Sequence, residues 1–317
     1  MHPLVLGDAV TLPRWLFLMR RRSRQYWLRL VGLVVVTALL GGVCVPIALG
    51  FATTMILLYA PCDERGTTPG DYGLPWQDVT LQASAGGQFR GYFIPGANGA
   101  TILVPPTTND GRDGRLEMAA LFARHGYAVL TFESRRCAGM GPLSLGYREA
   151  DDVGDALTYV THHAGVDPER VGVYGFSSAG ATAILAAARF AGIRAVLAEG
   201  GYGDFAEDAI GRESGTILEA IYKWSLHASY RAITGLDINK LSPADVIGAA
   251  APRPILLIYG AREPSLAGAR QQIAAAGPGA ELWVVEGAGH GAYRDAAPVE
   301  YEQRVIAFFD RALLERP

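Results

Sequence analysis

A predicted strand, a sharp turn and a predicted helix follow one another between residues 170 and 190. The segment Arg170 to Tyr174 is short and β-branched, Gly175-Phe-Ser-Ser-Ala-Gly180 follows it, and Ala181 to Phe190 is rich in alanine. A serine in so tight a turn has a strained backbone, so the flanking positions must carry almost no side chain. This arrangement is typical of the turn that presents a nucleophilic serine at the end of a sheet strand.

Ser177 is the better candidate nucleophile of the two serines in this turn. The usual pattern is G-x-S-x-G, and Gly175 stands two residues before Ser177, whereas Phe176 would crowd the same position for Ser178. Ala179 replaces the second glycine and adds one methyl group. The alternative interpretation is a glycine-rich turn with an incidental serine, so a base and an acid are needed from the rest of the chain.

His290 is the candidate general base. It lies after a predicted strand in the glycine-rich loop 286–292, from which an imidazole can reach a neighbouring strand end. Glu263 follows the predicted strand 254–259 and is the candidate acid that would orient the imidazole. Glu199 also ends a predicted strand and is the alternative acid, and the spacing does not decide between the two carboxylates.

From about Asp78 to Leu314 the chain resembles the serine hydrolases of the α/β-hydrolase superfamily, in the broad group of dienelactone hydrolases and prolyl-oligopeptidase-like esterases. The segments that carry the resemblance are 91–95, 119–130, 146–149 with 151–153, 167–173, the serine turn, 251–260 and the His290 loop. The resemblance implies an α/β fold with a mostly parallel eight-stranded sheet flanked by helices. It implies hydrolysis of a carboxylic ester or thioester through an acyl-enzyme, with no cofactor and no metal.

The resemblance also assigns the oxyanion hole to the backbone N–H groups of Thr107 and Ser178. Relatives usually carry His-Gly where this chain has Pro105-Pro106, which cannot donate. This loop and Ala179 are the features that favour a catalytically inactive binding protein of the same fold. A serine peptidase of the same fold is the other alternative.

An insertion at about 201–252 separates two predicted core strands and is expected to form a helical cap over the site. Its apolar residues are Phe205, Ile217, Leu218, Ile221, Tyr222, Trp224 and Tyr230. They either line an acyl pocket or pack the cap onto the body, and we expect packing for most of them.

Residues 30–60 contain no charged side chain. As a helix this segment would be about 46 Å long, against about 30 Å for the hydrocarbon core of a bilayer, so it predicts one transmembrane anchor. A cleaved signal peptide is the rival interpretation, although its apolar region is usually only about 7–15 residues long. Residues 61–75, rich in Gly, Pro and Thr, are then a linker, and residues 76–317 are the hydrolase domain.

The segment 1–29 carries six arginines and is opposed only by Asp8. The positive-inside rule therefore predicts a cytoplasmic tail and an extracytoplasmic hydrolase domain, with Trp15, Tyr26 and Trp27 in the interfacial layer. Beside a membrane span, the arginines indicate topology and not a nucleic-acid partner. The expected partners are thus the membrane, through residues 30–60, and a small-molecule or lipid-like acyl ester. The 26 arginines against 2 lysines suggest a GC-rich bacterial genome.

The three cysteines are too few for a disulfide framework. Cys44 falls within the predicted anchor. Cys62 and Cys137 would both face an oxidising compartment, and we hypothesise that they pair.

Overall fold

The computed structural model describes residues 14–211 and 213–315, with the side chains of residues 14–23 left out. Within this part of the chain eight strands form one sheet in the order β1-β2-β4-β3-β5-β6-β7-β8. The strands are β1 Gln77–Gln82, β2 Gln88–Ile94, β3 Thr101–Val104, β4 Ala128–Phe132, β5 Val171–Phe176, β6 Ala195–Glu199, β7 Ile255–Gly260 and β8 Ala280–Val285. Only the β1–β2 and β2–β4 pairs are antiparallel. The predicted α/β fold with a mostly parallel eight-stranded sheet is confirmed.

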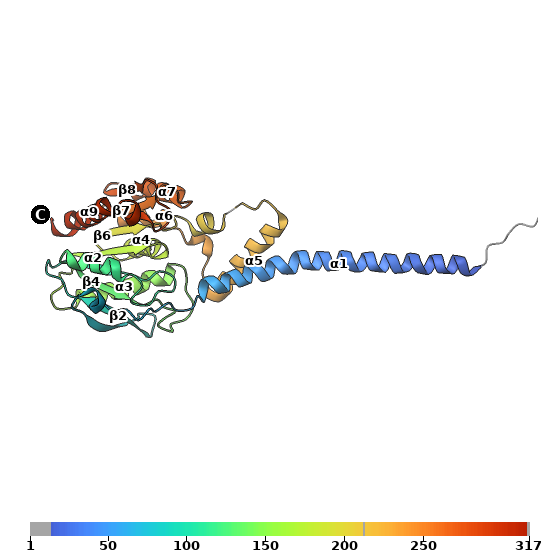
Figure 1. The fold of residues 1–317 in the computed structure, drawn as a ribbon, viewed down its shortest axis with the longest axis horizontal. Coiled ribbons are helices and arrows are strands. Elements are labelled where there is room, and N and C mark those ends of the chain that lie inside the picture. The colour runs from blue at the N-terminus through green and yellow to red at the C-terminus, as the bar shows by residue number, and fades with distance from the viewer. Residues whose placement is uncertain (1–13, 212, 316–317) are drawn as a thin grey trace, which may run out of the picture.

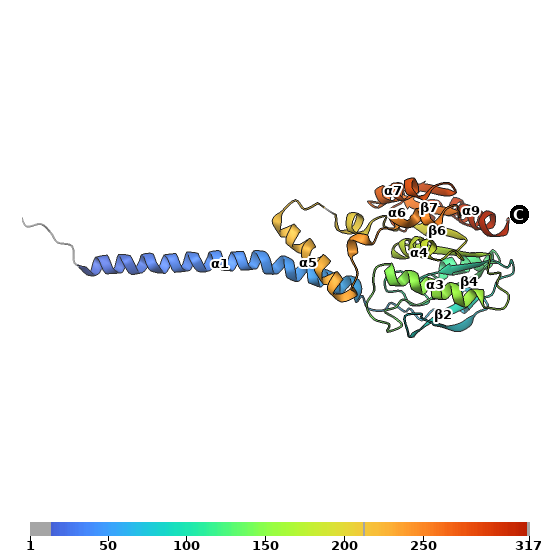
Figure 2. The same ribbon diagram turned by 180° about the vertical axis from the view of Figure 1, so that it is seen from behind.

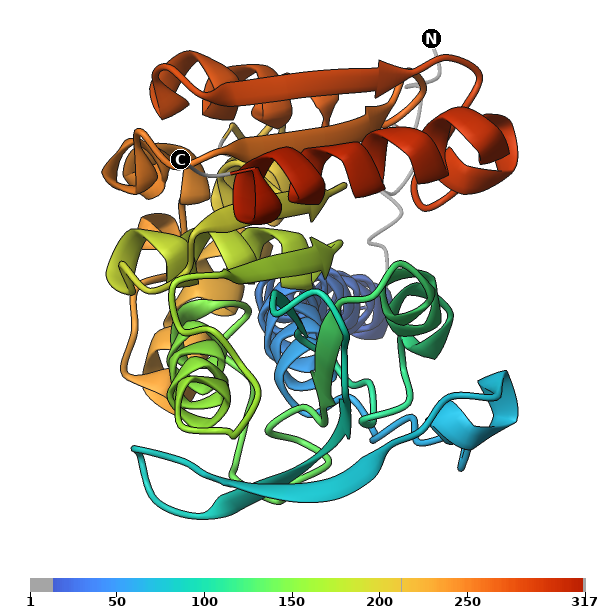
Figure 3. The same cartoon turned by 90° about the vertical axis from the view of Figure 1, so that its left-hand side faces the viewer.

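Helices cover both faces of this sheet (Figure 3). The α-helices are α1 Arg14–Leu58, α2 Leu116–Arg124, α3 Tyr147–Thr161, α4 Ser178–Arg189, α5 Ile217–Thr234, α6 Pro243–Val246, α7 Leu266–Ala276, α8 Tyr293–Ala296 and α9 Pro298–Phe309. α2 and α9 share one buried apolar cluster with the sheet, and α3, α4 and α7 share the other. The central strands are therefore buried on both faces, as is usual for parallel sheets.

Helix α1 projects from the body as a single long rod (Figures 1 and 2). Residues 24–58 form the one helix, among the described residues, that is long and apolar enough to cross a membrane. The helix begins at Arg14, well before the charge-free segment, and continues through the position of Pro46. The basic segment predicted over 1–29 lies partly outside the described residues.

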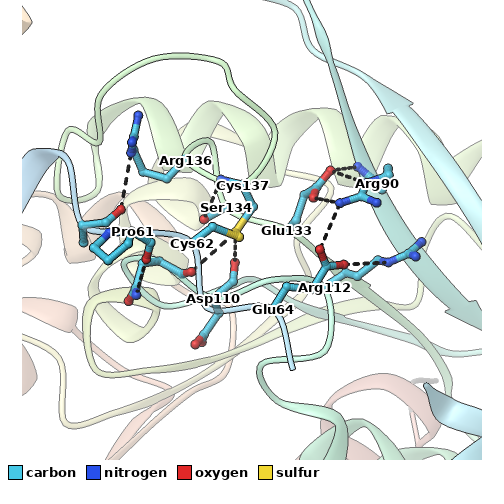
Figure 4. Close-up of a disulfide and its surroundings, with 12 residues drawn as sticks. Pro61, Cys62, Glu64, Arg90, Asp110, Arg112, Glu133, Ser134, Arg136 and Cys137 are labelled. Atoms are coloured by element: carbon cyan, nitrogen blue, oxygen red, sulfur yellow. Dashed lines mark hydrogen bonds and ion pairs between the residues drawn. A yellow bond between two sulfur atoms is a disulfide. The ribbon is translucent and has the colours of Figure 1, made fainter. Parts of the chain in front are cut away.

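The C-terminal end of α1 is fixed into the body of the α/β fold. Leu58 is fully buried, and its carbonyl accepts the N–H of Leu143 at 3.0 Å. A disulfide then joins Cys62 to Cys137, as hypothesised, with 5.0 Å between their Cα atoms (Figure 4). The N–H of the next residue, Asp63, donates to the carbonyl of Asn109 at 2.8 Å. The start of the segment expected to be a linker is thus fastened to the body.

The insertion 201–252 contains α5, which lies beside the C-terminal part of α1 (Figures 1 and 2). Phe205 and Tyr230 are buried, as expected for residues that pack the cap onto the body. Ile217, Leu218 and Trp224 are instead exposed. These three residues therefore do not pack the cap onto the body, although Leu218 lies near Gly42 of α1.

We expect the disulfide to contribute strongly to stability, because it closes a loop of 75 residues and restricts the unfolded chain. Replacing Cys62 and Cys137 by serine should lower the free energy of unfolding by about 2–4 kcal/mol. Denaturant unfolding of the detergent-solubilised chain measures this change. Cys44→Ser is the control and should leave the midpoint unchanged, since Cys44 is a free thiol on the exposed side of α1. Equal midpoints for all three proteins would show that the disulfide does not stabilise the fold.

Candidate active site

Ser177 sits in the turn between β5 and α4 with φ 53° and ψ −125°. This is a strained conformation for a residue with a side chain. The turn is possible because position 175 is glycine, where a Cβ would lie only 2.2 Å from the carbonyl oxygen of Ala179. Ala179 itself is buried, so its extra methyl group is accommodated where the usual G-x-S-x-G pattern has glycine. The strain presents the Ser177 side chain at the carboxyl edge of the sheet.

His290 connects Ser177 to Glu263. Its Nε2 lies 3.1 Å from Ser177 Oγ, and its Nδ1 lies 3.0 Å from Glu263 Oε2. The ring also packs on Phe176, with 4.9 Å between the ring centroids. The structure therefore brings together the three side chains that the sequence suggested, from the ends of β5, β7 and β8. The serine, imidazole and carboxylate are arranged for transfer of the serine proton to the imidazole.

Glu263 is held as a buried carboxylate. Its side chain is fully buried, and it accepts the N–H of Gly260 at 2.6 Å and the hydroxyl of Ser265 at 3.1 Å. Burial by itself raises the pKa of Glu263, but the hydrogen bonds from His290 and Gly260 outweigh it and hold the pKa below its usual value. The carboxylate is therefore ionised at neutral pH and can orient the imidazole through its Nδ1 hydrogen bond.

Glu199, the alternative acid, has different partners. Its carboxylate accepts the hydroxyls of Tyr174 at 2.9 Å and Tyr301 at 2.6 Å, while its backbone carbonyl accepts the N–H of Ser177 at 2.7 Å. Complete burial raises the pKa of Glu199 to about 7, despite the two tyrosine hydrogen bonds that lower it. The structure thus places Glu263, and not Glu199, against the imidazole.

The two residues expected to donate to the oxyanion, Ser178 and Thr107, differ in the hydrogen bonds of their backbone N–H groups. Ser178 is the first residue of α4, so its backbone N–H belongs to the helix N-terminus and has no acceptor within the helix. Thr107 departs from the prediction, because its N–H donates to Asp110 Oδ2 at 3.1 Å, and its hydroxyl bonds the same oxygen. Thr108 instead reaches the site, with its Oγ1 3.3 Å from Ser178 Oγ. An acid three residues after a threonine is the sequence signal for such a local bond.

A pocket of about 380 Å³ opens beside Ser177 and His290. Its other lining residues are Leu57, Thr108, Leu145, Ser178, Gly200, Tyr202, Phe205, Asp208, Ala209, Glu263, Pro264 and Ser265. Leu57 comes from the end of α1 and Leu145 from a loop where its φ is 63°, and sequence reasoning found neither. Asp208 was also missed, and it places a carboxylate among largely apolar residues.

The family comparison matches residues 56–293 to the X-Pro dipeptidyl-peptidase (S15) family. Two curated fungal proteins are similar over a shorter stretch. The thiohydrolase aneE of Aspergillus aculeatus is 31% identical over 118 residues, which cover 35% of this chain and 37% of that protein. The polyketide transferase af380 of Aspergillus fumigatus is 30% identical over 122 residues, which cover 35% of this chain and 40% of that protein. The chain thus spans about two fifths of the length of these relatives.

Solved structures share the fold at low identity. The esterase Pf2001 of Pyrococcus furiosus has a TM-score of 0.65 and 20% identity, covering 81% of this chain and 98% of the esterase. The α/β hydrolase GrgF of Penicillium sp. has a TM-score of 0.58 and 17% identity, covering 76% of this chain and 99% of that protein. Together the comparisons show a hydrolase. The curated relatives are fungal, so they give no support to a bacterial source.

The geometry predicts that Glu263 and Glu199 respond differently to the same substitution. Glu263→Gln should lower kcat for ester hydrolysis by roughly 10³–10⁴-fold, because an amide no longer stabilises the charged imidazole. Glu199→Gln should stay within about tenfold of wild type, since its side chain bonds tyrosines and not His290. Steady-state kinetics on a chromogenic ester measures both. A larger loss for Glu199→Gln would make that residue the acid.

Proposed function

The chain belongs to the X-Pro dipeptidyl-peptidase (S15) family, and on that premise we propose that it is a membrane-anchored serine hydrolase of carboxylic esters or thioesters. The observation that carries the proposal is the chain of hydrogen bonds from Ser177 through His290 to Glu263, at 3.1 and 3.0 Å. A positive φ at the serine of that chain supports it. A serine that occurs by chance in a glycine-rich turn is not expected to lie within hydrogen-bond distance of a histidine that is itself bonded to a carboxylate.

In the proposed mechanism Ser177 Oγ attacks the acyl carbonyl and its proton passes to His290 Nε2. Glu263 keeps the imidazole in the required tautomer and stabilises its positive charge. His290 then gives the proton to the leaving alcohol or thiol, which leaves an acyl-enzyme. Water attacks the acyl group with His290 again as base, and Ser177 is regenerated.

The oxyanion of the tetrahedral intermediate needs two N–H donors. We assign one to Ser178, at the N-terminus of α4. The other falls to the loop after β3, where Thr107 donates to Asp110 and Thr108 lines the pocket. The Thr108 N–H is therefore our candidate for the second donor.

The anchor is part of the same proposal. The charge-free segment 30–60, of which α1 contains residues 30–58, is long enough for one span, and the arginines before it favour a cytoplasmic N-terminus. The hydrolase domain, residues 76–317, then lies on the other side of the membrane. The Cys62–Cys137 disulfide supports an oxidising compartment for that domain.

Esters and thioesters are favoured as substrates by the names of the similar proteins, an esterase and a thiohydrolase. The second candidate function is removal of an X-Pro dipeptide, as the family name states. Asp208 favours it, because a carboxylate in the pocket can pair with the N-terminal ammonium of a peptide. That carboxylate already accepts the N–H of Gly203 at 2.6 Å, which also gives it a structural role.

A three-substrate comparison separates the two functions. We expect the detergent-solubilised chain to hydrolyse a p-nitrophenyl acyl ester and an acyl thioester, and to act poorly on an Xaa-Pro p-nitroanilide. Both ester activities should fall at least roughly 10³-fold in Ser177→Ala. Asp208→Asn should leave them within about tenfold of wild type, because acyl groups carry no ammonium.

The opposite result would favour the peptidase. Preference for the Xaa-Pro amide, with a selective loss of that activity in Asp208→Asn, would contradict the ester proposal. A folded protein without activity on any of the three substrates would favour the inactive binding protein.

A further inference from the structure

Helix α5 presents an exposed apolar face. Ile217, Leu218 and Trp224 are 76%, 50% and 64% exposed, and the alanines at positions 220 and 228 are exposed as well. Ile217, Ala220, Trp224 and Ala228 fall on one side of the helix and form a stripe. Leu218 lies beside this stripe, near Gly42 of α1. Large apolar side chains gathered on a surface mark a site for a partner or a membrane.

The opposite side of α5 packs closely on α1. At Gly50 a Cβ would lie 2.8 Å from the Cβ of Ser225, so the two helices could not approach this closely with a larger residue there. Ser225 Oγ donates to the carbonyl of Ile47 at 2.7 Å, and Thr54 Oγ1 donates to the carbonyl of Leu226 at 3.2 Å. Small residues and side-chain to backbone bonds are the contacts that join helices within membranes. α5 is therefore fixed to the anchor itself.

The length of α1 places this crossing at a membrane surface. The exposed Tyr26 and Trp27 are suited to one interfacial layer. A hydrocarbon core takes about 20 helical residues, and counted from Trp27 these end near Ile47. Ile47 is the residue whose carbonyl binds Ser225 of α5. The contact between the two helices extends from Gly42 to Thr54 and so includes the level at which α1 would leave the bilayer. This level lies at the end of α1 that is joined to the hydrolase body (Figures 1 and 2).

The charges of α5 fit an interface and not a second span. Glu219 pairs with Lys223 at 2.7 Å in the first turns, where Lys223 Nζ also reaches the carbonyl of Glu213. Charges in this part of α5 are costly in hydrocarbon but acceptable among headgroups. Arg231, in the last turn, is exposed and can meet lipid phosphate. A helix with such charges and an apolar stripe suits the interfacial layer, which α5 enters alongside α1, with Leu218 near Gly42 and Leu226 bonded by Thr54.

We propose that the exposed face of α5 binds the interfacial layer of the membrane leaflet beside the hydrolase domain, with Trp224 as its aromatic anchor. The inference rests on the anchor in the proposed function and deepens it. The face is continuous with the exposed apolar residues of α1 at the crossing, such as Val45 and Leu49, which the same leaflet would cover. Leu57 of the pocket lies only about 15 Å further along α1 than Ile47. The pocket is thereby held close to the lipid headgroups.

Fluorescence quenching by brominated lipid tests this placement. The full chain is reconstituted in phosphatidylcholine vesicles, with or without lipid brominated near the top of its acyl chains. Subtracting the spectrum of Trp224→Phe from that of wild type isolates the Trp224 emission. Trp27→Phe isolates a residue of the proposed anchor. Trp283→Phe is the control in the hydrolase body, since Trp283 lies in β8 with Arg304 4.8 Å from its ring.

We expect the Trp224 and Trp27 emissions to fall at least roughly two-fold in brominated vesicles, and the Trp283 emission to stay unchanged. Quenching of Trp27 without quenching of Trp224 would overturn the inference and leave the anchor intact. In that case, cross-linking of Ile217→Cys chains in a Cys44→Ser background would identify a second copy as the partner of this face. Absence of quenching at both Trp27 and Trp224 would overturn the anchor, and the inference with it.

Discussion

The strained backbone at Ser177 is the constraint on which the site depends. A positive φ at a serine is held only where the surrounding structure fixes it, and here Gly175, the N-terminus of α4 and the carbonyl of Glu199 do so. The same parallel strands that create this turn end beside β7 and β8, which supply Glu263 and His290. The candidate catalytic side chains are therefore carried by short segments that follow the carboxyl ends of the strands, in keeping with the location of sites in open α/β sheets.

Much of this arrangement follows from local sequence patterns. The strand, turn and helix around Ser177 and the glycine-rich loop of His290 are short-range signals. From them the α/β fold was predicted, with Ser177 and His290 as candidate site residues. The choice between Glu263 and Glu199 was open, because both end a strand and only packing shows that tyrosines surround Glu199. Thr107 was placed wrongly, since its N–H bonds Asp110 within the loop. The exposed face of α5 was missed because apolar residues in a cap insertion suggest packing against the body. The sequence alone does not show which side of α5 the body covers.

Helix α1 and the hydrolase domain form one continuous structure. Leu58 ends α1 inside the core, Leu57 lines the pocket, and the disulfide at Cys62 follows within a few residues. With α5 packed on the same helix, the cap and α1 form a single unit. In the proposed function, this unit would hold the pocket beside a lipid surface.

The central claim is that Ser177 is an activated nucleophile, and labelling with a fluorophosphonate probe tests it most directly. The probe forms a stable adduct only with a serine whose hydroxyl is deprotonated by a neighbouring base. We predict that wild type and Ser178→Ala are labelled, and that Ser177→Ala is not. An unlabelled but folded wild type, or equal labelling of wild type and Ser177→Ala, would contradict the account.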